Sequence, residues 1–102
     1  MQNAGSINTD SLISQGIIEP EQLSQLIKEH LQDLVILDAS FVLPGSGLDP
    51  HQAYLDEHIE GARFFDIEDI SDKNNPLPHM LPPVEQFEQA VNALGIHNES
   101  LI

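Results

Sequence analysis

The chain has 102 residues, of which 40% are apolar, and its formal net charge is −14 because 17 Asp and Glu outnumber three Lys and Arg. This length accommodates one small domain, and the negative field around it excludes nucleic acids and anionic membrane surfaces as partners. The chain has no cysteine, which excludes disulfides, thiolate metal sites and a thiol nucleophile within these residues.

The start of the chain shows no targeting signal. Residues 1–10 lack the basic and apolar regions of a signal peptide, and no apolar run anywhere approaches the roughly 20 residues that span a bilayer. We therefore expect a cytoplasmic location. The first residues are mostly small and polar, so we expect a flexible leader over residues 1–16, with the domain itself over residues 17–102.

An amphipathic helix is predicted over residues 19–32. Pro20 suits the first helical position, and apolar residues then recur at helical spacing, at Leu23, Leu26, Ile27 and Leu31. The apolar run Leu34–Leu37 follows, bounded by Asp33 and Asp38. It is too short for a helix and is typical of a strand buried on both faces, so we predict the first strand of a parallel sheet here.

The middle of the chain predicts a loop, a short helix and a second strand. Glycine and proline indicate a loop over Leu43–Gly47. Asp49 is a suitable N-cap for a helix that starts at Pro50 and runs to about residue 57. Two adjacent aromatic residues then predict a strand over Ala62–Asp66.

The last third of the chain predicts a long loop and a helix. Four of the thirteen residues in Ser71–Pro83 are proline, which excludes regular structure. Apolar spacing then predicts a helix from Val84 to Leu94, ended by Gly95 in a left-handed conformation, and a further strand is expected to begin at Leu101. This alternation predicts an α/β fold with a parallel sheet flanked by helices. Because so short a sheet has uncovered edges, we expect a piece of a larger domain.

The chain contains five histidines, at positions 30, 51, 58, 79 and 97, and none has the spacing of a metal site. Helix-end roles are expected for His30 and His97, a solvated position for His51, and a backbone hydrogen bond in the turn before Gly61 for His58. His79 differs because it lies in a proline-stiffened apolar loop, which is a suitable place for one functional titratable group.

An acidic cluster follows the second predicted strand, at Asp66, Glu68, Asp69 and Asp72. Its position at the carboxyl end of a strand favours a functional role, since open α/β sheets bind their ligands there. An acidic, solvated loop is the alternative in a chain of this charge. No metal or cofactor is predicted, and Gly45–Gly47 lacks the lysine and spacing of a phosphate-binding loop.

Three stretches resemble the amino-terminal domain of the rhodanese and 3-mercaptopyruvate sulfurtransferase family. Leu37–Ser40 resembles the end of that domain's first strand, Tyr54–Phe65 resembles the first rhodanese signature, and Asp66–Pro82 resembles the segment after it. Glu60 departs from the signature, which usually has proline at this position. The resemblance implies an incomplete rhodanese-like domain over residues 17–102, without the family's second domain that carries the reactive cysteine.

The family's chemistry implies roles for two residues of this chain. In that chemistry a cysteine thiolate takes sulfur from a donor as a persulfide and passes it to cyanide or a thiol. The resemblance implies that His79, in the Pro-His-Met-Leu-Pro loop, assists proton transfer at the thiol, supported by Glu68, where many members have aspartate. The implied donor is 3-mercaptopyruvate or thiosulfate.

Two functional interpretations stay open at the level of sequence. The first is an enzyme whose partners are a small-molecule sulfur donor, a thiol acceptor such as thioredoxin, and the second rhodanese domain of the same protein. The second is a catalytically silent rhodanese-like module that serves for interdomain packing, partner docking or regulation. Without a cysteine, these 102 residues alone are expected to be inactive.

Overall fold

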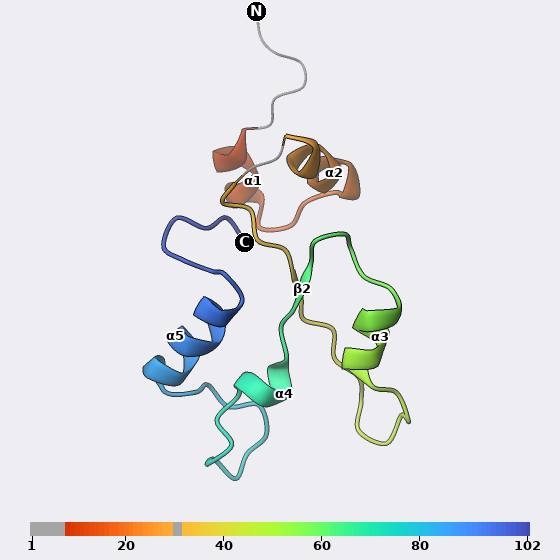
Figure 1. Ribbon diagram of the computed structural model, residues 1–102, viewed down its shortest axis with the longest axis vertical. Coiled ribbons are helices and arrows are strands. Elements are labelled where there is room, and N and C mark those ends of the chain that lie inside the picture. Colours follow the sequence, from red (N-terminus) through yellow and green to blue (C-terminus); the bar gives the residue numbers. More distant parts are fainter. Residues whose placement is uncertain (1–7, 30–31) are drawn as a thin grey trace, which may run out of the picture. The chain divides into compact units, whose positions relative to one another are not determined.

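The computed structural model describes residues 8–29 and 32–102, and it divides the chain into two units, Met1–Leu34 and Val35–Ile102. Each unit has its own helices (Figure 1). Among the described residues, no helix has the length and apolar content needed to cross a membrane.

The first unit contains two short helices. Helix α1 spans Thr9–Gln15 and is capped by the Asn8 side chain, which accepts from the Ser11 N–H at 3.2 Å. Helix α2 spans Pro20–Lys28, begins at the proline as predicted, and is preceded by Glu19, whose N–H donates to the Gln22 side chain at 2.8 Å. Each helix buries one leucine against this unit's small core, at positions Leu12 and Leu26.

Two predictions for this segment need correction. The expected leader over residues 1–16 includes α1, because an N-cap and a buried Leu12 stabilise a seven-residue helix that apolar content alone did not indicate. The helix predicted over 19–32 ends at Lys28, with Glu29 as its C-cap. Residues 1–7 and His30 lie outside the described part of the chain, and the domain boundary at residue 17 stays a prediction.

The second unit has a parallel pair of strands, as predicted. Strand β1 spans Leu37–Asp38 and β2 spans Arg63–Phe64, with Leu37 opposite Arg63 and Asp38 opposite Phe64. The ladder is bounded by N–H donation from Arg63 to the Ile36 carbonyl and from Phe65 to the Asp38 carbonyl, both at 2.9 Å.

The first strand therefore lies later than the predicted run Leu34–Leu37, and the second is shorter than Ala62–Asp66. The reason is that pairing depends on the partner strand, and Asp66 leaves β2 to cap the next helix. On the other side, the Val35 N–H donates to the Leu101 carbonyl at 2.8 Å, where a further strand was expected to begin.

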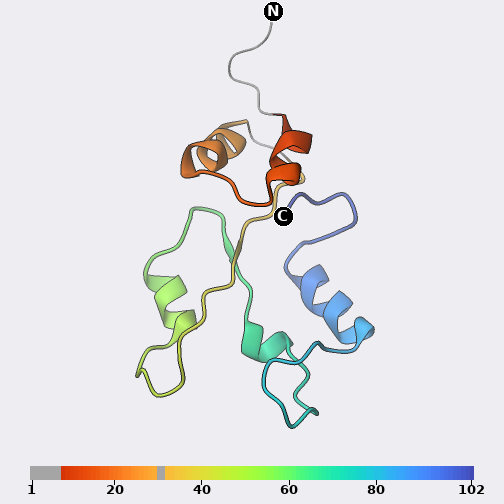
Figure 2. The ribbon, with the colours of Figure 1, turned by 180° about the vertical axis from the view of Figure 1, so that it is seen from behind.

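Three helices accompany this sheet. Helix α3 spans Pro50–Asp56 behind its predicted Asp49 cap, α4 spans Ile67–Ile70, and α5 spans Val84–Ala93. Both α3 and α5 agree with their predictions, and Gly95 after α5 has the expected positive φ of 84°. In the views from front and back, α3 and α5 lie on opposite sides of the strand pair (Figures 1 and 2).

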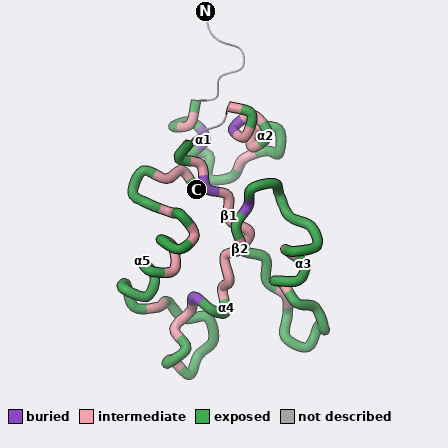
Figure 3. The backbone as a smooth tube through the Cα atoms, in the orientation of Figure 1, coloured by how far each residue is buried: buried purple, intermediate pink, exposed green. Residues whose placement is uncertain are grey.

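Burial within the second unit is limited. Its buried residues, among those drawn in purple in Figure 3, are Val35, Ala62 and Ile70. Several large apolar side chains are more than half exposed, including Leu43, Leu48, Leu55, Leu77, Leu81 and Val84. A parallel sheet needs cover on both faces, so this pattern fits the prediction of an incomplete α/β domain.

Candidate active site

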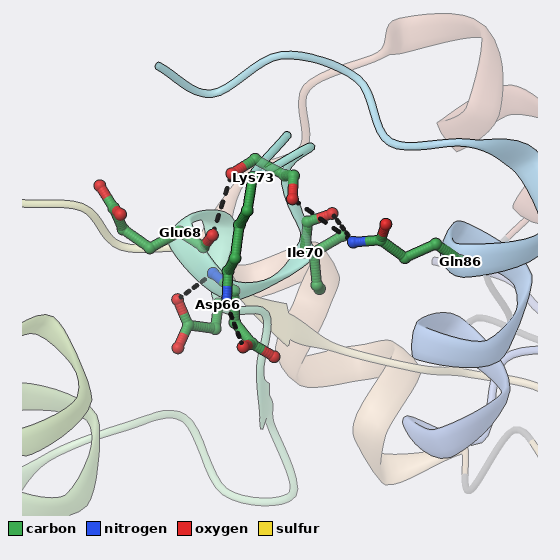
Figure 4. Close-up of polar contacts among 7 residues, drawn as sticks. Asp66, Glu68, Ile70, Lys73 and Gln86 are labelled. Atoms are coloured by element: carbon green, nitrogen blue, oxygen red, sulfur yellow. Dashed lines mark hydrogen bonds and ion pairs between the residues drawn. The ribbon is translucent and has the colours of Figure 1, made fainter. Parts of the chain in front are cut away.

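Helix α4 places Glu68 directly after β2, at the carboxyl end of the sheet. Asp66 caps this single turn, because its carboxylate accepts from the Asp69 N–H at 3.1 Å (Figure 4). The Ile70 side chain is 8% exposed and anchors the turn in the core, while the Glu68 side chain is 71% exposed. The helix was not predicted from sequence, since four residues are too few for a periodic signal.

Hydrogen bonds within the proline-rich loop give it a defined shape. The Asp72 N–H donates to the Met80 carbonyl at 2.8 Å, which closes the loop at its base. The Asp72 carboxylate accepts from the Asn74 N–H at 3.0 Å, and the Asn75 side chain accepts from the Leu77 N–H at 2.9 Å. Together with the prolines, these bonds reduce the conformations open to the loop.

His79 lies at the end of this loop with an uncommon backbone conformation. Its φ is +57°, and it is the one non-glycine residue with positive φ among residues 8–29 and 32–102. Histidine tolerates the left-handed region better than most residues, but the conformation still costs free energy and tends to occur at functional positions. The surrounding loop therefore holds His79 in a backbone conformation that an unconstrained chain would rarely adopt.

His79 and Glu68 meet. The His79 Nε2 and Glu68 Oε1 atoms are 2.8 Å apart, and the His79 side chain is 32% exposed. When the neutral ring donates from Nε2 to the carboxylate, Nδ1 carries no proton and can accept one. A histidine held in this way can act as a general base and, once protonated, as a general acid, with one nitrogen available to a reactant.

The pair lies beside an open hollow of about 310 Å³. This volume is in the range of small-molecule sites. The hollow is bounded by α4 and the proline-rich loop, and its lining residues are Glu68, Ser71, Asp72, Lys73, Asn75, Pro76, Leu77, Pro78 and His79. A reactant at His79 thus has both polar groups and the apolar edges of two prolines and a leucine around it.

The other acidic residues of the cluster have local structural roles. Asp66 caps α4, Asp72 shapes the loop, and Asp69 pairs with Lys73 at 3.0 Å on the exposed surface. The functional interpretation of the acidic cluster therefore applies to one residue, and the interpretation as a solvated loop applies to the others. Glu68 joins His79, and its neighbours form the solvated and capping part of the cluster.

Two contacts that support the site were missed by sequence reasoning. From α5, Gln86 donates to the carbonyls of Ile70 and Ser71, at 3.2 and 3.4 Å, and so ties that helix to the end of α4 (Figure 4). Phe41, in the loop after β1, contacts the His79 ring. Neither had a signal in the sequence, because both partners are distant along the chain.

The remaining described histidines lie away from this pair. His58 makes a backbone contact as predicted, but with the Tyr54 carbonyl at 2.6 Å in the last turn of α3, and not in the turn before Gly61. His51 is exposed, and its ring is stacked relative to that of Tyr54 and tilted relative to that of Phe64. The His97 N–H donates to the Ser100 hydroxyl in a turn after α5.

No described group of three or more His, Cys, Asp or Glu side chains is arranged to hold a metal ion. A second hollow, of about 340 Å³, lies at the end of β1 and is lined by Ile36, Leu37, Asp38, Ala39, Ser40, Ile59 and Ala62. Hydrogen bonds from the Ser40 hydroxyl and the Ser40 N–H lower the pKa of the Asp38 carboxyl there.

No protein-family model matches the chain. Individual proteins do. A probable 3-mercaptopyruvate sulfurtransferase of Schizosaccharomyces pombe is 43% identical over 72 residues, covering 71% of this chain and 24% of that protein. The mitochondrial thiosulfate/3-mercaptopyruvate sulfurtransferase 1 of Arabidopsis thaliana is 40% identical over 96 residues, covering 94% of this chain and 25% of that protein.

A solved structure agrees with these relatives. The crystal structure of SseA from Escherichia coli, described by its rhodanese fold as a 3-mercaptopyruvate sulfotransferase, matches with a TM-score of 0.61 and 45% identity. The match covers 71% of this chain and 29% of that one. The chain thus spans about a quarter of the length of the curated relatives it matches.

Proposed function

This chain belongs to the rhodanese and 3-mercaptopyruvate sulfurtransferase family, and we propose that it forms one wall of a sulfurtransferase active site whose proton-transfer group is His79. The observation that carries the proposal is the Nε2 to Oε1 distance of 2.8 Å between His79 and Glu68 beside an open hollow. A histidine held by a carboxylate at one nitrogen is suited to general acid–base catalysis at the other.

The chain has no cysteine, so the nucleophile in this proposal comes from a second rhodanese domain of the same protein. His79 Nδ1 takes the proton of that thiol, and the thiolate attacks the sulfur of 3-mercaptopyruvate. A sulfur–sulfur bond forms as the carbon–sulfur bond breaks, and its electron pair leaves as the enolate of pyruvate. The imidazolium then returns the proton to the enolate carbon, which leaves a cysteine persulfide for transfer to a thiol or cyanide.

Glu68 has a supporting role in this scheme. Its carboxylate accepts the hydrogen bond from Nε2 and so keeps the His79 ring in the tautomer whose Nδ1 can take the thiol proton. Because Glu68 is 71% exposed, its contribution is smaller than that of a buried carboxylate. Thiosulfate is the alternative donor, since the names of the relatives include both compounds.

The test compares sulfur transfer from 3-mercaptopyruvate and from thiosulfate by the intact protein and its variants. His79→Ala is expected to lower kcat for 3-mercaptopyruvate about 100-fold or more, which is the usual contribution of general acid–base catalysis. The matched control is His51→Ala, because His51 is an exposed histidine of α3 outside the pair. Unchanged rates in His79→Ala with both donors would leave this domain as a catalytically silent module for packing, docking or regulation.

We also propose a thiol acceptor such as thioredoxin and a cytoplasmic location. The comparison compartment is the mitochondrion, because one relative is named mitochondrial. Cell fractionation with an antibody against the protein tests the location. Persulfide transfer to reduced thioredoxin tests the acceptor, and a rate equal to that without thioredoxin would exclude it.

A further inference from the structure

Phe41 lies against the imidazole of His79. The two ring centroids are 4.9 Å apart, and the ring planes meet at 85°. Phe41 belongs to the loop that follows β1, and His79 to the loop that follows α4. The parallel pairing of β1 and β2 brings these segments together, because the carboxyl ends of parallel strands lie at the same edge of a sheet.

His79 needs a second constraint besides Glu68. A single hydrogen bond from Nε2 allows the imidazole to swing about that bond, and Glu68 itself is a long, 71% exposed side chain. The backbone φ of +57° places His79 in the left-handed region but does not by itself define the plane of the ring. A perpendicular aromatic ring with its centroid 4.9 Å away is a contact that can restrict this rotation.

We propose that Phe41 is a positioning residue of the site, which sets the plane of the His79 ring and so the direction of Nδ1. The inference rests on the proposed function, in which Nδ1 exchanges a proton with the reactants. It names the one aromatic contact that the structure shows for His79 among the described residues. Phe41 is 42% exposed.

The structure offers a matched control in Phe87. This residue is also a phenylalanine with 42% exposure, and it lies on α5. Phe41→Leu and Phe87→Leu therefore remove a ring from equally exposed positions. Phe41→Tyr keeps the ring and tests rescue, which remains informative if Phe41→Leu is too unstable to study.

The first readout is kinetic and uses the intact protein with 3-mercaptopyruvate. Phe41→Leu is expected to lower kcat about two- to tenfold with KM unchanged, which corresponds to the coupling of one aromatic pair. Phe41→Tyr and Phe87→Leu are expected to retain kcat. In a His79→Ala background, Phe41→Leu is expected to cause no further loss, since Phe41 acts through His79.

The second readout does not depend on activity. In proton–carbon correlation spectra of the intact protein, the His79 ring signal, assigned with His79→Ala, is expected to move in Phe41→Leu and to stay in Phe87→Leu. A His79 signal that does not move overturns the proposal, as does an equal loss of kcat in the presence and absence of His79. If His79→Ala keeps full activity, the proposed function fails, while the spectra still decide whether Phe41 orients the ring.

Discussion

Gly95 is expected to be the most sensitive glycine of the second unit, because two separate costs meet there. Its φ is +84°, and a Cβ at this position would meet the guanidinium of Arg63. That guanidinium donates to the Leu94 carbonyl at the end of α5. An alanine at position 95 must therefore adopt a strained backbone and also displace Arg63 from the helix end.

The two costs can be estimated separately. The left-handed backbone costs a non-glycine residue about 1–2 kcal/mol. Loss of the Arg63 hydrogen bond costs about 1 kcal/mol, which is below the usual range of about 1.5–3 kcal/mol for a charged donor because the arginine is exposed. Gly95→Ala should therefore lower the free energy of unfolding by about 2–3 kcal/mol.

Urea denaturation of the intact protein measures this loss, and Gly61→Ala is the matched control. Gly61 has a φ of +81°, but its Cβ would meet nothing within 4 Å, so only the backbone cost of about 1–2 kcal/mol is expected. In an Arg63→Met background, Gly95→Ala should cost no more than Gly61→Ala. Equal destabilisation by the two alanines in the unmodified protein would refute the role of Arg63.

Two further predictions concern polar contacts of the second unit. Tyr54→Phe removes the hydroxyl that donates to the Ala62 carbonyl at 2.6 Å. Because Ala62 is 4% exposed, the free energy of unfolding measured by urea denaturation should fall by about 1 kcal/mol. An unchanged urea midpoint would contradict this prediction. Ser40→Ala removes the larger of the two hydrogen-bond causes that lower the Asp38 pKa, so that pKa should rise toward its ordinary value while the Ser40 N–H keeps it partly depressed. Since the depressed pKa contributes stability above about pH 4 that is lost as pH falls through the folded pKa, this loss on acidification should be smaller in the variant. Carboxyl carbon NMR of Asp38 checks this, and a pKa that does not rise would refute it.

Capping residues in the sequence correctly predicted the helices whose ends they mark. The Asp49 and Pro50 pair defined the start of α3, and Gly95 defined the end of α5, because caps depend on backbone groups only a few residues away. The same reasoning missed α1 and α4. Those helices are short, and each depends on one buried side chain, Leu12 or Ile70, whose burial cannot be predicted from its neighbours in sequence.

The exact bounds of a strand could not be predicted without knowledge of its partner strand. The apolar run Leu34–Leu37 indicated a strand, but the ladder with Arg63 and Phe64 lies at Leu37 and Asp38. A parallel ladder forms only where both chains are extended side by side, and that overlap is a property of two distant segments. Sequence reasoning could therefore place the strand within a few residues and could not set its register.

The candidate site divides in the same way. The residues alone indicated that His79 lies in a proline-stiffened loop, that acidic residues follow the second strand, and that no thiol is available within the chain. The family resemblance had already paired Glu68 with His79, whereas the 2.8 Å contact between them and the position of Phe41 across the ring are seen only in the tertiary structure. The physical reason is that stiffness and charge are local properties of a segment, whereas the direction of a side chain depends on the segments that folding brings beside it.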